Sequence, residues 1–445
     1  MPIQNFPASL QPIIQQNYLE REFEDAIQSV LGFRSIADRE PFPNGVGETI
    51  TKTRRGLKAP TITPLNPSGN TNLDNGLTPT GWTVEQYTLT INTYGDTIDL
   101  NTVTSGVAIK RQFLENAKVN GVQSAQSLDR LARNTLYSAY LGGQTWVRAT
   151  NGGLQATFQV DDIRGFQTVF NSVGQQVTIS ASNTLVISVN GNPYTLIGAV
   201  ADAVNVSKAI LAGGISGVLT LSGNILVADA TLSNPAVSSV APYIQRPNGK
   251  ASTYTLAGSD LFTMGSVLDA VAQLRSNGVP TADSGYYHCY LDPKSARQLF
   301  ADPDFKLLYQ GATEASAVFK QGKPINMLDV KFISTTEAYV QPHPVTAGLV
   351  VRRVLVVGGG ALIEGDFENI AHADVPLKNS IIHMVDGIAL VTRPPLDRLA
   401  QIIAQSWYWI GGFTVPTDLT ANSTIIPTAN NAYYKRAAVI EHASS

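Results

Sequence analysis

The feature that most constrains the fold is a long run of extended sequence between Gly47 and Leu100. Two strand-like segments enclose 26 residues, Gly56 to Gly81, with four prolines, four glycines and no helical period. Loops of this length are uncommon inside compact domains unless they are functional or disordered. The sequence therefore predicts a long arm that has no hydrophobic core of its own.

The two sides of this arm differ in pattern. In the outgoing segment ETITKTRR (48–55), neither face of a strand would be clearly apolar. In the return segment, Tyr87, Leu89 and Ile91 alternate with polar residues, which is typical of a half-buried strand. We therefore expect the arm to be anchored through its return side and free at its tip.

Charge is scarce along the whole chain. Only 15% of the 445 residues are Asp, Glu, Lys or Arg, against about 25% in typical soluble domains. Because charged side chains are depleted at the cores of protein interfaces, the chain either buries much of its surface against other chains or is a secreted or merely polar-rich protein. Both interpretations remain open on composition alone.

Several function classes are disfavoured by simple counts. A net charge of −3 does not steer the molecule towards nucleic acid or an anionic membrane. The single cysteine, Cys289, excludes an internal disulfide framework and fits a reducing cytoplasm. We see no signal peptide at the N-terminus and no apolar run long enough for a membrane span.

Two long helices are predicted before the middle of the chain. Residues 10–31 place Leu19, Phe23, Ile27 and Val30 on one stripe. Residues 105–143 carry a longer stripe, and Gly142 and Gly143 stop it. At 1.5 Å per residue the second helix would span roughly 50 Å, so it needs support along its length.

Residues from about 172 to 250 have few charges and several short β segments. Asn190-Gly191 is a strong hairpin signal between two of them. We expect a helix over 199–212 and helices in both flanking segments, 160–173 and 256–278. The simplest interpretation is a compact domain inserted between two helices of a host domain.

The rest of the chain mixes strands and helices without a βαβ rhythm. Strands are expected at 286–291, 330–336, 349–359, 387–392, 399–415 and 435–442. Asp292 with Pro293 is a strong start signal for a helix. The predicted fold class is therefore α+β.

A search for chemistry gives no catalytic, cofactor-binding or metal-binding residues. His288-Cys289 lies in an apolar strand and is interpreted as a buried structural pair. The glycines in VLVVGGGALIEGDFE (354–368) lack the helix that a phosphate site needs. The basic cluster Lys52, Arg54, Arg55 and Lys58 is either a solvated face or a set of salt-bridge partners for another subunit, with nucleic-acid contact as a third reading.

The order of these parts resembles the major capsid (coat) proteins of tailed phages, with the Hong Kong 97-type fold. GETITKTRRGL and LTPTGWTVEQYTLTINTYGDTIDL look like the two sides of that family's extended loop. VAIKRQFLENAKVNGVQSAQSLDRLARNTLYSAYL looks like its spine helix, and LDPKSARQLFADPDFKLLYQG with GKPINMLDVKFISTTEAY is similar to the body of podovirus-like coat proteins. The resemblance covers nearly the whole chain outside residues 172–250.

The resemblance implies a set of domains. They are an N-terminal arm (1–46), an extended β loop (47–100), a spine helix with a peripheral domain (101–171), a small inserted α/β domain (172–250), an axial-domain body (251–365) and C-terminal strands (366–445).

It also implies a structural function without catalysis or cofactors. Many copies would form hexamers and pentamers of an icosahedral shell around double-stranded DNA, in a virion assembled in the host bacterial cytoplasm. Scaffolding protein, a portal and a decoration or cement protein would be further partners, and no membrane is involved. In this hypothesis Trp82 and Tyr87 anchor the base of the arm, while Arg54, Arg55 and Lys58 pair with carboxylates of a neighbouring subunit.

Three alternatives are weighed against this one. An encapsulin-type shell would have the same fold but would hold protein cargo. An exported surface-layer or adhesin protein would explain the Thr- and Asn-rich strands but should carry an export signal. An enzyme would need a clustered polar site, which the sequence does not indicate.

Overall fold

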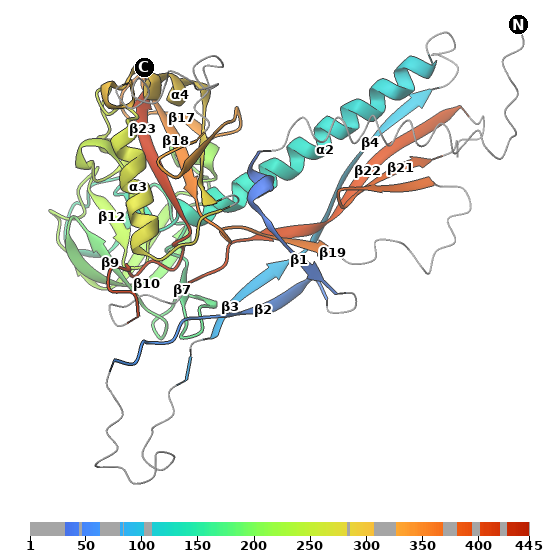
Figure 1. Ribbon diagram of the computed structural model, residues 1–445. Helices are drawn as coiled ribbons and strands as arrows, with labels where there is room; N and C mark the ends of the chain where they lie inside the picture. The colour runs from blue at the N-terminus through green and yellow to red at the C-terminus, as the bar shows by residue number, and fades with distance from the viewer. Residues whose placement is uncertain are drawn as a thin grey trace, which may run out of the picture. The chain divides into compact units, whose positions relative to one another are not determined.

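The fold is known from a computed structural model that describes residues 32–43, 47–62, 81–82, 84–101, 109–282, 285–306, 326–367, 381–393, 401–418 and 425–444. Strands predominate over helices in these residues (Figure 1), and the predicted α+β class is confirmed. The helix expected over 10–31 and the arm tip at 63–80 lie outside the described residues.

The chain divides into two compact units. Unit 1 comprises the N-terminal residues up to Ile50, Leu89–Arg133 and Leu362–Thr414. Unit 2 comprises Thr51–Thr88, Asn134–Ala361 and the residues from Val415 onwards. Each unit therefore draws on segments far apart in the sequence, and the boundary runs through both the arm and the long helix.

Unit 1 is built on a six-stranded sheet of order β1-β19-β22-β21-β20, with β4 also paired to β22. Its strands are β1 (Asp38–Phe42), β4 (Asn92–Asn101), β19 (Ile363–Phe367), β20 (Ile381–Val385), β21 (Ile388–Arg393) and β22 (Ile402–Thr414). The strands expected at 387–392 and 399–415 are thus confirmed. The antiparallel ladder between β4 and β22 runs from the pair Asn101–Ile402 to the pair Asn92–Gly411.

The predicted long helix is α2, Ile109–Tyr140. Its unit 1 part runs along the sheet (Figure 1), where Ala125 and Leu128 pack against Leu390, Trp407 and Trp409. Burying a leucine side chain in this way contributes about 2 kcal/mol. The apolar stripe read from the sequence is therefore what holds this helix to the sheet.

A buried ion cluster holds the chain just before β1. In the short 3-10 helix η1 (Phe33–Ile36), the Arg34 guanidinium lies 2.6 Å from the Glu364 carboxylate and 2.9 Å from that of Asp386. The Arg34 backbone N–H also donates to Asp129 of α2 at 3.0 Å. Charge-assisted bonds of this kind are stronger than neutral ones, so this part of the expected N-terminal arm is fixed to unit 1.

The body of unit 2 is a seven-stranded sheet of order β13-β23-β18-β14-β16-β15, with β17 paired to β18. Its strands are β13 (Ile244–Gln245), β14 (Tyr287–Leu291), β15 (Asn326–Met327), β16 (Val330–Ser334), β17 (Val340–Pro342), β18 (Val350–Val357) and β23 (Ala437–Ser444). The helices of this body are η3 (Pro247–Gly249), η4 (Thr253–Thr255), α3 (Met264–Ser276) and α4 (Pro293–Ala301).

The structure confirms the local features that the sequence predicts for this body. The four strands expected at 286–291, 330–336, 349–359 and 435–442 are present. Asp292 caps α4 by accepting a hydrogen bond from the Lys294 N–H at 3.1 Å. His288 and Cys289 are both buried, as expected of a structural pair.

A second sheet of unit 2, here called the 144–238 sheet, has the order β5-β12-β9-β10-β11-β6. Its strands are β5 (Gln144–Trp146), β6 (Gln155–Val160), β9 (Leu185–Val189), β10 (Asn192–Ala201), β11 (Gly217–Ile225) and β12 (Pro235–Ser238), with the small hairpin β7 (Thr168–Phe170) and β8 (Gln176–Thr178) nearby in sequence. Phe158, Ile187, Leu196 and Leu219 belong to its buried core. The Asn190-Gly191 hairpin is confirmed, because β9 and β10 pair across it.

The domain boundaries expected for this region do not match the sheet. The expectation was an α/β domain over 172–250, but the sheet begins at Gln144, directly after α2, and ends at Ser238. Within 144–238 the only helix is η2 (Ile210–Ala212), so the α/β description is wrong. The expected helix in the flank 160–173 is also absent, whereas the one in 256–278 is present as α3.

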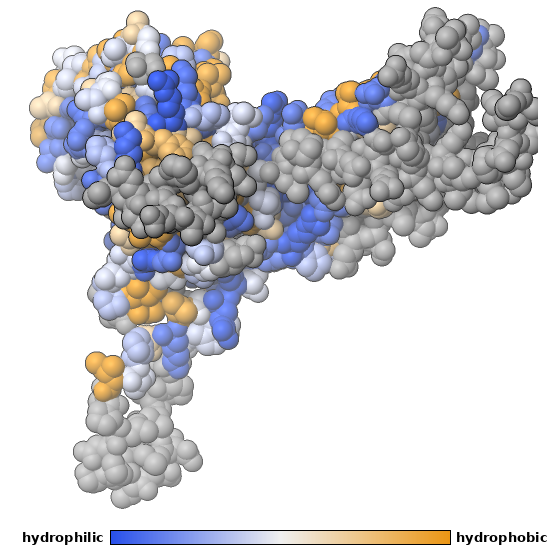
Figure 2. Space-filling view, turned by 45° about the horizontal axis from the view of Figure 1, so that its top comes forward, coloured by the Kyte–Doolittle hydropathy of each residue, from blue (hydrophilic) through white to orange (hydrophobic). Residues whose placement is uncertain are grey.

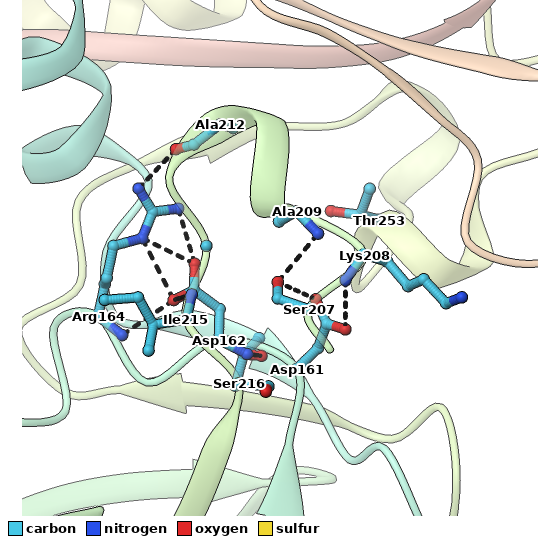
Figure 3. Close-up of polar contacts among 12 residues, drawn as sticks. Asp161, Asp162, Arg164, Ser207, Lys208, Ala209, Ala212, Ile215, Ser216 and Thr253 are labelled. Carbon is cyan, nitrogen blue, oxygen red and sulfur yellow. Dashed lines mark hydrogen bonds and ion pairs between the residues drawn. The ribbon is translucent and has the colours of Figure 1, made fainter. Parts of the chain in front are cut away.

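The segment expected to be a helix at 199–212 is instead the end of β10, a loop fixed by charged groups and the single 3-10 turn η2 (Figure 3). Asp161 accepts hydrogen bonds from the Ser207 hydroxyl at 3.1 Å and the Lys208 N–H at 2.9 Å. Arg164 pairs with Asp162 at 2.7 Å and donates to the Ala212 carbonyl at 2.7 Å. These contacts, together with the pairing of β10 to β11, outweigh the helical propensity of this alanine-rich segment.

Candidate functional site at the base of the arm

The arm is held to the protein through its return strand. The outgoing strand β2 (Thr49–Arg55) pairs with β3 (Val84–Thr90) in a two-stranded sheet. Strand β3 buries Glu85, Tyr87 and Leu89, whereas β2 has no fully buried residue. The prediction that the return side anchors the arm is therefore confirmed.

Beyond its paired strands, the described arm exposes large apolar side chains. Leu57 is 50% exposed, Ile62 is 91% exposed and Trp82 is 53% exposed. Hydrophobic and hydrophilic surface are interspersed along this part of the arm (Figure 2). Removing apolar surface from water is favourable by about 25 cal/mol for each Å², so contact with another surface would stabilise this part of the arm.

A group of charged residues, here called the basal cluster, lies where β2 ends. Its members are Arg54, Glu85, Asp418, Lys435 and Arg436. The Arg436 guanidinium donates two hydrogen bonds to the Asp418 carboxylate, at 2.8 and 3.0 Å. Its third nitrogen donates to the Gly359 carbonyl at 2.8 Å. Arg54 Nη1 lies 3.9 Å from Asp418 Oδ1, which is ion-pair range but longer than a hydrogen bond.

Two members of the basal cluster are almost fully buried. Glu85 is 2% exposed and Lys435 is 4% exposed. Burial lowers the pKa of the Lys435 ammonium, and the carboxylates of Asp418 and Glu85 oppose that shift. Because buried charges persist only beside opposite charges, these residues fix the foot of the arm to the body of unit 2.

The residues predicted to make inter-subunit contacts fall into two groups. Arg55, Lys58 and Trp82 are exposed and remain available for a neighbour. Tyr87 is buried in its own chain, and Arg54 is half-buried beside Asp418. The structure brings Arg54 and Arg55 together at one cavity, which Lys58, Trp82 and Tyr87 do not line.

The sequence analysis missed the C-terminal half of this site. Asp418, Lys435 and Arg436 lie more than 360 positions from Arg54, and no local pattern links such distant residues. Two weak signals were available. Glu85 stands at an inward position of the β3 alternation, and the adjacent cations Lys435 and Arg436 directly precede a buried strand.

A buried polar group elsewhere in unit 2 superficially looks catalytic. Ser295 Oγ lies 2.7 Å from His442 Nε2, and Ser295 also donates to Asp292. The acid thus contacts the serine rather than orienting the histidine, and Ser295 and His442 are both fully buried, so no substrate reaches them. The arrangement is a structural link between α4 and β23.

Two other kinds of site were sought in the described part of the chain. No group of three or more His, Cys, Asp or Glu residues there has the arrangement of a metal site. None of the described helices combines the length and apolar character needed to cross a membrane.

The chain was compared with known proteins. No protein-family model and no curated protein sequence matches it. Among solved structures it is similar to the capsid of Ralstonia phage GP4, at 11% identity and a TM-score of 0.49, with 92% of this chain and 87% of that chain covered.

Two further solved structures are also similar to the chain. The capsid of cyanophage P-SCSP1u has 10% identity and a TM-score of 0.45, with 92% and 87% of the two chains covered. A virus-like particle from Pyrococcus furiosus has 9% identity and a TM-score of 0.36, with 95% and 98% covered.

Proposed function

We propose that the chain is a structural subunit that self-assembles into the capsid shell of a tailed phage. The observation that carries this proposal is the arm, whose described residues beyond the paired strands include the exposed apolar side chains Leu57, Ile62 and Trp82. An order of arm, long helix and mixed α+β body, as found here, is what the resemblance to phage coat proteins implies.

The physical basis is that an extended arm is stabilised only when it lies across a neighbour. Ordering each residue of such a segment costs about 1–2 kcal/mol of backbone entropy, which contacts within the arm do not offset. In a closed symmetric shell every contact recurs in each copy. We expect each subunit to bury more than about 2,000 Å² against its neighbours, as in obligate assemblies.

The finer features of the proposed shell come from the family resemblance. Copies would form hexamers and pentamers that enclose double-stranded DNA, assembled in the cytoplasm of a bacterial host. A scaffolding protein, a portal and a decoration protein would be its further partners. In such a shell Arg55, Lys58 and Trp82 would contact the neighbour, Arg54 would pair with one of its carboxylates, and Tyr87 would support the arm from its foot.

The test is electron microscopy and size-exclusion chromatography of the purified full-length chain. The proposal predicts closed particles of megadalton size, with DNA as their content when they are isolated from infected cells. A stable 47.6 kDa monomer or dimer at high concentration would contradict it. Particles that carry protein in place of DNA would favour an encapsulin-type shell.

A further inference from the structure

A cavity of about 150 Å³ lies at the foot of the arm. Its wall is formed by the end of β2, by the segment after α3 and by the chain that leads into β23. The charged residues that line it are Arg54, Arg55, Glu85, Asp418, Lys435 and Arg436. Since a single water needs about 10–15 Å³ by the same kind of measure, the cavity has room for a small polar group.

The charges around this cavity do not balance. Among the described residues that line it, four cations face two carboxylates, which is an excess of two positive charges. Asp418 is already held by both ends of the Arg436 fork at 2.8 and 3.0 Å. Its carboxylate therefore neutralises Arg436 first and Arg54 only in part.

The Arg54 side chain has an unused donor at this place. Its Nη1 atom is buried and has no hydrogen-bond partner among the described residues, since Asp418 is 3.9 Å away. Leaving a buried charged donor without a hydrogen bond costs about 1–3 kcal/mol or more. A planar guanidinium is suited to pair with the two oxygens of a carboxylate or phosphate.

A second buried donor belongs to Tyr140 of α2, which lies outside the lining of the cavity. The Tyr140 hydroxyl also has no hydrogen-bond partner among the described residues. Burial raises its pKa most strongly and Asp418 raises it further, whereas Arg436 and Arg54 act in the opposite direction. The foot of the arm thus combines surplus positive charge with a buried donor, Arg54 Nη1, that has no hydrogen-bond partner among the described residues.

We propose that this cavity is an oxyanion-binding site and that, in the assembled shell, its ligand is the carboxylate of an Asp or Glu side chain from a second copy of this chain. This inference rests on the proposed function. Leu57, Val279 and Ile426 supply apolar wall beside the cations, which suits the short aliphatic stem of an acidic side chain. A nucleic-acid strand would instead require a continuous basic groove with stacking aromatic residues.

The first experiment measures anion binding by the unassembled full-length chain, with inorganic phosphate as the probe at constant ionic strength. Calorimetric titration should detect binding that Arg54→Met weakens at least tenfold, since a charge-assisted hydrogen bond is lost. The matched control is Arg297→Met, which removes an exposed cation of α4 and should leave binding unchanged. Absence of phosphate binding, or equal binding by Arg54→Met, overturns the site.

The second experiment identifies the source of the oxyanion. Arg54→Glu should block assembly while the melting temperature of the subunit stays within a few degrees of the wild type. Single lysine replacements of exposed carboxylates should then include one that restores particles to Arg54→Glu, whereas the control Arg297→Glu should form particles without any second change. Particles formed normally by Arg54→Glu overturn the carboxylate ligand.

The two proposals fail in different ways. If the wild-type chain forms no particles, the proposed function is wrong, and the phosphate titration still decides the anion site. If particles form but phosphate does not bind, only the anion site is wrong.

Discussion

The arm and the 144–238 sheet are both made of strands, yet they are stabilised in different ways. The sheet closes around its own buried residues, among them Phe158, Ile187 and Leu219. In the described part of the arm before β4, β3 buries its inward side, while Leu57, Ile62 and Trp82 are exposed. A strand signal in a sequence therefore says little about which partner will cover the strand.

The largest effect should come from making the arm polar. Replacing Leu57, Ile62 and Trp82 together with serine should abolish particle formation, because the apolar surface offered to a neighbour is lost. The same variant should unfold at nearly the wild-type temperature, since exposed side chains contribute little to the isolated subunit. Chromatography and a thermal melt measure the two outcomes.

A matched control for this variant is Leu154→Ser, which alters an equally exposed aliphatic residue between β5 and β6. It should leave both assembly and melting unchanged. If the triple arm variant unfolded at a clearly lower temperature, the arm residues would contribute to the stability of the isolated subunit, and the contrast with the self-stabilised 144–238 sheet would be wrong.

The opposite change is to open the core of the 144–238 sheet. Phe158 is buried beside β11, and Phe158→Ala should lower the free energy of unfolding by about 3–5 kcal/mol through lost contacts and a new cavity. Hydrogen exchange should show the loss in β6, β9, β10 and β11 but not in β2 and β3. Equal loss of protection in the arm strands would mean that the arm depends on this core.

Sequence reasoning succeeded where the signal was local. Three features were predicted from residues only a few positions apart in the sequence. They are the apolar helix stripe that contains Leu128, the Asp292 cap and the Asn190-Gly191 turn. It failed at 199–212, where pairing of the end of β10 with β11 overrides helical propensity. It also missed Asp418 and Arg436, because only the folded chain places them beside Arg54.

Lowering the pH should affect a third region, the body of unit 2, more than the other two. Neither the arm nor the 144–238 sheet contains a histidine. In the body of unit 2, burial lowers the pKa of His442 to about 4. The folded protein then binds this proton more weakly than the unfolded chain, whose histidine has a pKa near 6.5. Stability is therefore full above about pH 6.5 and falls as the pH drops, by about 1 kcal/mol at pH 5.5 and roughly 3 kcal/mol at pH 4.

Urea unfolding of the wild type and of His442→Gln between about pH 7 and pH 5.5 checks this expectation. The wild type should lose more stability over this range than the variant. Hydrogen-exchange protection should fall in β23 and stay constant in the arm strands. Parallel pH dependence in the two proteins would contradict the assignment to His442.

The smallest effect concerns two glycines. Gly191 has a φ of 87° in the hairpin of the 144–238 sheet and no atom near its missing side chain, so Gly191→Ala should cost about 1 kcal/mol from backbone strain alone. Gly81 of the arm also has open space around it but no positive φ, and Gly81→Ala should be neutral. Thermal melts of the two variants test this contrast, and equal shifts would contradict it.

The ladder between β4 and β22 has a mechanical consequence. Strand β3 continues into β4, which pairs with β22 along its whole length from Asn92 to Asn101. Since the hydrogen bonds of an antiparallel ladder stand perpendicular to its strands, a pull along β4 loads all of them in shear at once. Tension that enters through the arm is thereby shared across the sheet of unit 1, and no single bond must resist it alone.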